Sequence, residues 1–184
     1  MLTALEVISQ YLNQAISAER GFESQFRSCA KDGDDADVQT FFVRCADRAS
    51  ANVEILATRL SALNATEHGG THFLADLLAM APKLGQTGHT AEERIAQNLM
   101  QGFALAKSGC AMYLALQSAA RAARDGQTQE LAGRLGSEAE AAAEQFWHFL
   151  PSRSKIAYNV CTAGEIDPAV ETRAPDDRVT ETLS

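Results

Sequence analysis

Apolar residues recur every three to four positions along most of the first 150 residues, and this spacing predicts long amphipathic helices. The helices are expected over residues 3–30, 36–63, 90–125 and 128–150. Gly33 marks the first break, where the adjoining aspartates suit the next helix start. Thr90 with Glu93 forms a capping-box pattern. Pro151 predicts the end of the last helix, because proline cannot donate a backbone hydrogen bond.

The lengths of the connections indicate the fold class. A long connection over residues 64–90 separates two helix pairs that have short turns, and it carries enough apolar residues near 73–80 for a short crossing helix. The sequence therefore predicts an all-α, antiparallel four-helix bundle of ferritin-like topology, with a long crossover between helices 2 and 3. Residues 1–150 are expected to form this bundle, and residues 151–184 a C-terminal extension that is mostly a disordered acidic tail. From Glu165 onward the chain has six acidic and two basic side chains and no apolar period.

Glu19 interrupts the apolar stripe of the first helix. The other stripe positions are apolar: Leu5, Ile8, Leu12, Ala15, Phe22, Phe26 and Cys29. A carboxylate without a cation or hydrogen-bond donors is costly to bury. Glu19 therefore either binds a metal or meets polar partners inside the bundle.

A di-metal site in such a bundle takes one Glu from each of two helices and a Glu-x-x-His pair from each of the other two. The second helix instead has Ala49 and Asn52 at its inward mid-helix positions, and the third helix has Gly102, Phe103 and Ala106. In the fourth helix Ala141 follows Glu138 at the position where His is required. Its one histidine, His148, pairs at i, i+4 with Glu144 on an outward face. A complete di-metal site is not expected.

Glu19 then has two remaining interpretations. It can be a structural polar contact, satisfied by Asn52, Gln101 or Tyr113, or by one of the arginines of the first helix pair. Those arginines are Arg20, Arg44, Arg48 and Arg59. Alternatively, Glu19 is a remnant of a metal site or the ligand of a single metal.

Composition narrows the class of partner. A net charge of −8 argues against binding nucleic acid through its phosphates. No apolar run approaches the ~20 residues of a membrane span, and no signal peptide is recognisable, so a cytoplasmic protein is expected.

The scattered cysteines, Cys29, Cys45, Cys110 and Cys161, fit reduced thiols. Glu67, His68 and His72 in the connection form the run "EHGGTH", which could hold a metal. These residues and His89 are more simply loop residues.

The runs "LNQAISAERGF" and "VQTFFVRCADRASANVEILATRLSALN" resemble the first hairpin of small bacterial ferritin-like proteins of unknown function. Gly21 and Phe22 match a Gly-Phe pair of that family, and Tyr113 matches its aromatic position in the second hairpin. The resemblance covers about residues 5–150. Where the family has an acidic residue in an Arg-Gly-Glu context, this chain reads Gln-Gly-Phe, ending at Phe103. The resemblance implies the fold and a stress or storage context, with a degenerate di-metal ligand set, and no particular reaction.

These observations favour a non-enzymatic bundle that has no cofactor and acts through self-association or partner binding. Small residues on the third helix suggest a homodimer or larger homo-oligomer: Gly102, Gly109, Ala111, Ala115, Ala119, Ala120, Ala122 and Ala123. The acidic tail is a candidate for docking a protein partner. One alternative is an iron-binding or iron-oxidising metalloprotein with an atypical site around Glu19. Another is a bundle that binds an apolar small molecule among Phe22, Phe42, Phe103 and Phe146.

Overall fold

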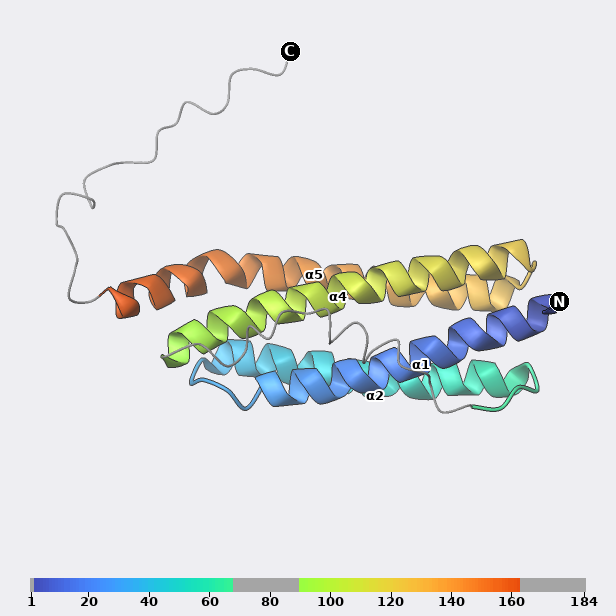
Figure 1. Cartoon of the computed structure of the whole chain (residues 1–184), viewed down its shortest axis with the longest axis horizontal. Helices are drawn as coiled ribbons and strands as arrows, with labels where there is room; N and C mark the ends of the chain where they lie inside the picture. Colours follow the sequence, from blue (N-terminus) through green and yellow to red (C-terminus); the bar gives the residue numbers. More distant parts are fainter. Residues whose placement is uncertain (1, 68–89, 163–184) are drawn as a thin grey trace, which may run out of the picture.

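Four long helices account for most of residues 2–67 and 90–162, the part of the chain that the computed structural model describes (Figure 1). They are α1 (Ala4–Cys29), α2 (Ala36–Ala62), α4 (Ala91–Ala122) and α5 (Gly126–Cys161). No strand occurs in these ranges, so the expected all-α class is confirmed for them. The expected crossing helix near 73–80, His68, His72, His89 and residues 163–184 of the expected tail lie outside the described residues.

Each helix begins at a side chain that accepts a backbone N–H bond of its first turn. Asp35 accepts from Val38 at 3.1 Å, and Thr90 accepts from Glu93 at 3.1 Å, as the sequence pattern predicts. Thr3 and Glu6 form a full capping box, which the pattern did not single out. These caps fix where the helices start and therefore which residues face the interior.

The helices pack as two pairs, α1 with α2 and α4 with α5, and the pairs meet chiefly through α1 and α4 (Figure 1). Contacts between α2 and α5 are far fewer than those within either pair. Two arginines nevertheless join the ends of α2 and α5. Arg59 donates to Asp125 at 2.7 Å, and Arg153 donates to Asp35 at 2.8 Å. The line of contact between α2 and α5 is called the α2–α5 seam below. It has an ion pair at each end and is thinly packed between them.

Pro151 lies inside α5, so the expected stop of this helix at residue 150 is wrong. Proline lacks one helical hydrogen bond and its ring crowds the carbonyl four residues earlier. Contacts made beyond it offset this cost. Arg153 binds Asp35, its guanidinium lies 5.2 Å from the ring centroid of Phe149, and Ala157 is buried.

Two leucines expected on buried faces are exposed. Leu5 is 49% exposed and Leu114 is 63% exposed, although both fit the three-to-four spacing. The apolar faces of α1 and α4 are therefore narrower at these positions than the sequence pattern predicts. None of the described helices has an apolar stretch long enough to cross a bilayer.

An aromatic cluster fills one half of the core. Phe146 on α5 is fully buried, and its ring centroid lies 5.9 Å from Phe26, 4.7 Å from Phe41 and 5.3 Å from Phe42. Gly102 on α4 lies directly against the same ring, because a Cβ added to this glycine would be 2.3 Å from Cε1 of Phe146. The glycine makes room for the phenylalanine.

Replacing Gly102 with alanine is expected to destabilise the fold by about 1–3 kcal/mol, as overpacking does, despite the better helix propensity of alanine. Gly109→Ala on the same helix is the matched control. Its new Cβ would lie 3.6 Å from its nearest neighbours, so a gain of about 0.5–1 kcal/mol is expected. Urea denaturation of both variants measures the difference. If both gain stability, the Gly102–Phe146 contact does not constrain the core.

Candidate functional site

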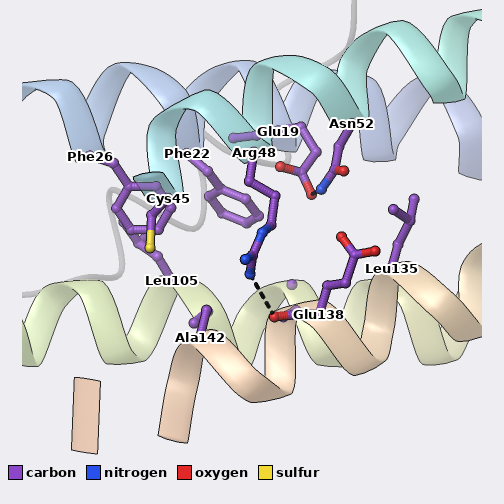
Figure 2. Close-up of a pocket in the computed structure, with 14 residues that line it drawn as sticks. Glu19, Phe22, Phe26, Cys45, Arg48, Asn52, Leu105, Leu135, Glu138 and Ala142 are labelled. Carbon is purple, nitrogen blue, oxygen red and sulfur yellow. Dashed lines mark hydrogen bonds between the residues drawn. The ribbon is translucent and has the colours of Figure 1, made fainter. Parts of the chain in front are cut away.

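Glu19 lies in the middle of the bundle and is only 4% exposed. Its Oε1 atom accepts a hydrogen bond from the hydroxyl of Tyr113 on α4. It accepts a second, at 3.3 Å, from Nδ2 of Asn52 on α2, which lies beside it in Figure 2. Three helices therefore meet at one carboxyl oxygen. Of the expected partners of Glu19, Asn52 and Tyr113 are confirmed.

The other expected partners of Glu19 bind elsewhere. Gln101 accepts a hydrogen bond from Gln25 at 3.2 Å. All four arginines also have other partners. Arg20 binds Glu67, Arg59 binds Asp125, and Arg44 lies over the ring of Phe41. Arg48 donates to the backbone carbonyl of Glu138 and acts on Glu19 only through its charge.

Burial raises the pKa of Glu19 from an ordinary value of 4.5 to about 7, because an apolar surrounding disfavours the charged form. The bonds from Tyr113 and Asn52 and the charge of Arg48 oppose this rise, whereas the nearby carboxylate of Glu138 adds to it. Burial, and then the charge of Glu19, raises the pKa of Tyr113, so its hydroxyl stays protonated and remains a donor. The site thus holds a carboxyl group that changes charge near neutral pH.

A cavity of about 40 Å³ lies beside Glu19 at the α2–α5 seam and is open to solvent on one side. It has room for about one to three water molecules. Its walls are mainly apolar and come from all four helices: Phe22 and Phe26 on α1, Ala49 on α2, Leu105 and Gly109 on α4, and Leu135 on α5. The cavity exists because small residues face one another where α2 and α5 are thinly packed.

Two charged side chains border this cavity at the seam. Arg48 extends from α2 across the cavity and donates to the backbone carbonyl of Glu138 on α5 at 3.3 Å (Figure 2). The carboxylate of Glu138 is turned toward Glu19 and Asn52 in the same view. It also accepts from Arg134 at 3.1 Å, and its side chain is 34% exposed. The seam therefore has one guanidinium and one half-buried carboxylate beside the buried Glu19.

The residues at this site do not fit a pair of iron ions. In residues 2–67 and 90–162 no three side chains among His, Cys, Asp and Glu converge to hold a metal. Asn52 and Tyr113 direct donor hydrogens at Glu19, where a metal site would require oxygen or nitrogen lone pairs. His148 and Glu144 are both exposed on α5, as expected.

The expected apolar site among four phenylalanines is divided. Phe42 and Phe146 pack together in the aromatic cluster, and Phe22 joins them through Phe26. Phe103 lies apart, 5.7 Å from the ring centroid of the exposed Trp147. The cavity lies next to the cluster, on the Glu19 side, so its position differs from the one expected.

The small residues of the third predicted helix lie on two different faces of α4. Gly102, Gly109 and Ala120 are buried within the bundle, whereas Ala111, Ala115 and Ala122 are exposed on α4. The continuous small-residue surface expected from the sequence is therefore split between the core and solvent.

Sequence reasoning noted Glu138 but gave it no partner, and it assigned no contact across the seam to Arg48. One signal for the cavity was present in the sequence. Small residues occupy mid-helix positions in three helices, at Ala49, Gly109, Ala139 and Ala142. No protein-family model and no curated protein matches this chain.

Proposed function

We propose that this protein is a non-enzymatic four-helix bundle of ferritin-like, antiparallel topology that binds a small molecule in the cavity beside Glu19. The end-to-end ion pairs between α2 and α5 support the antiparallel arrangement, since each joins the last part of one helix to the cap of the other. The split between a polar end at Glu19 and apolar walls supports ligand binding, because small-molecule sites combine an apolar lining with few orienting polar groups.

The observation that carries the proposal is the position of the cavity. It lies at the seam where the bundle is thinly packed, and its inner wall includes a buried carboxyl group. The apolar walls of this open cavity face solvent in the free protein. A bound molecule with an apolar part would remove that surface from water. Iron binding has no comparable support among the described residues, and self-association, a cytoplasmic location and docking through the tail stay predictions.

A ligand titration followed by ¹H–¹⁵N NMR tests the proposal. Ethanol is the probe, because it is small and combines a hydroxyl group with a short apolar chain, as the polar end and apolar walls of the cavity require. We expect saturable shifts of the amides of Ala49, Asn52 and Ala139 in the native protein. Gly109→Ala places a methyl group between Phe22 and Ala139 without overlap, so it should weaken these shifts severalfold.

Gly126→Ala is the matched control, since nothing lies within 4 Å of a Cβ at this position at the start of α5. Its titration should equal that of the native protein. Ethanol shifts that are as large on the outer surface as at the cavity, or that persist in Gly109→Ala, would contradict binding at this site.

A further inference from the structure

We propose that Arg48 is a charge-controlled strap across this cavity. While Glu19 is neutral, the guanidinium rests on the backbone carbonyl of Glu138 and leaves room for a neutral ligand. When Glu19 is ionised, the guanidinium turns onto its carboxylate and takes up the space beside it. This inference rests on the proposed function and adds the regulation of that site by pH.

The described contact of Arg48 is weak. Among the described residues its guanidinium makes one hydrogen bond, at 3.3 Å to the backbone carbonyl of Glu138. This distance exceeds the usual range for an N–H···O bond, and the acceptor is uncharged. The side chain is exposed and runs from α2 past the cavity to the backbone of α5 (Figure 2). A moderately stronger acceptor within reach is therefore enough to move it.

Glu19 is that acceptor once it carries a charge. Glu19 and Arg48 line the same cavity of about 40 Å³, so rotation of the arginine side chain brings the two groups together without displacing α2. Hydrogen bonds between a guanidinium and a carboxylate are roughly twice as strong as bonds between neutral groups. A protonated Glu19 offers no such gain. The position of the strap therefore follows the charge of Glu19.

The groups that face Glu19 from α2 and α4 do not compensate its charge, apart from Arg48. Tyr113 and Asn52 donate to Oε1 as uncharged groups. Burial raises the pKa of Cys45 to about 11 and also raises the pKa of Tyr113, so both stay uncharged near neutral pH. Glu19 itself changes charge in this range, because burial raises its pKa to about 7.

On α5, the carboxylate of Glu138 also borders the cavity, but it already has a cationic partner. Arg134, one turn earlier in α5, donates to it at 3.1 Å. The charge of Glu138 opposes the ionisation of Glu19, whereas the charge of Arg48 favours it. Among the described residues that line the cavity, Arg48 is therefore the cation available to Glu19.

The strap is tested by repeating the ethanol titration at a pH of about 5.5 and of about 8.5, and by following the ¹H–¹⁵N signal of Nε of Arg48. We expect ethanol to bind about fivefold more weakly at the higher pH, the factor by which a charge-assisted hydrogen bond typically exceeds a neutral one. The Arg48 signal should shift with the same midpoint as the carboxyl ¹³C signal of Glu19. Glu19→Gln should abolish the pH dependence of both ethanol binding and the Arg48 signal, because glutamine does not ionise.

Arg48→Gln should remove most of the difference between the two pH values while ethanol still binds at the lower one. The titration midpoint of Glu19 should rise in this variant, because the ionised carboxylate loses its cation. Arg44→Gln is the matched control. It removes the same charge one turn earlier in α2, where the guanidinium lies over the ring of Phe41, and it should behave as the native protein.

An Arg48 signal that does not follow Glu19, or equal ethanol affinity at both pH values in the native protein, overturns the strap and leaves the proposed function standing. If ethanol binds at neither pH, the proposed function fails. The Arg48 signal then decides by itself whether the guanidinium follows the charge of Glu19.

Discussion

Truncating Phe146 to alanine is expected to lower the free energy of unfolding by about 3–5 kcal/mol, the cost of removing a fully buried aromatic ring. Its ring contacts those of Phe26, Phe41 and Phe42. α5 makes few other contacts with α2, so much of the apolar attachment between these two helices depends on this side chain. Equilibrium urea unfolding followed by circular dichroism measures the loss.

Phe103→Ala is the matched control for this substitution. Phe103 is half-buried and contacts the exposed ring of Trp147 on the outer face, so its loss should cost no more than about 1 kcal/mol. Combining Gly102→Ala with Phe146→Ala sharpens the test, because the alanine at 102 should become harmless once the ring is gone. Equal losses for Phe146→Ala and Phe103→Ala would show that the cluster does not hold the helix pairs together.

Replacing Glu19 with glutamine is expected to stabilise the protein relative to the native chain. This gain should be about 3 kcal/mol larger at pH 8 than at pH 4.5. The pKa of Glu19 is raised from 4.5 to about 7 in the folded state, chiefly by burial. Folding therefore favours the protonated carboxyl. The corresponding stability is fully present below pH 4.5, is lost as the pH rises toward and through 7, and amounts to about 3 kcal/mol.

Glutamine cannot ionise, but it has a carbonyl oxygen that can accept from Tyr113 and Asn52. The measurement is the difference in unfolding free energy between Glu19→Gln and the native protein across pH 4.5–8. Carboxylates with lowered pKa values, such as Asp35 and Asp125, lose their contribution only at lower pH and are common to both proteins. A difference that stays constant over this range would show that Glu19 does not titrate there.

The helices and their starts could be predicted from the sequence, because both depend on local patterns. The three-to-four spacing locates α1, α2 and α4 to within a few residues, and Asp35 and Thr90 are recognisable caps. The inward position of Glu19 follows from the same spacing. Asn52 and Tyr113 could be named among its partners because few other polar residues are expected near the middle of the bundle interior. These features need no knowledge of how the helix pairs meet.

The features that the sequence did not predict depend on contacts between distant segments. α5 continues past Pro151 because Arg153 reaches Asp35, and no local rule contains that contact. Leu114 fits the periodicity yet faces solvent, because it lies on a side of α4 that the described helices leave uncovered. The cavity arises from the distance between α2 and α5, which the volumes of Ala49, Ala139 and Ala142 do not fill.

The two terminal ion pairs of the α2–α5 seam have a kinetic consequence. Arg59 with Asp125 and Arg153 with Asp35 fasten the ends of the two helices, and Phe146 packs against Phe41 and Phe42 between them. The cavity beside Glu19 opens to solvent in the remaining gap, which Arg48 crosses. A solute can therefore exchange with bulk water while all of these contacts persist, so its residence time need not depend on unfolding of the chain.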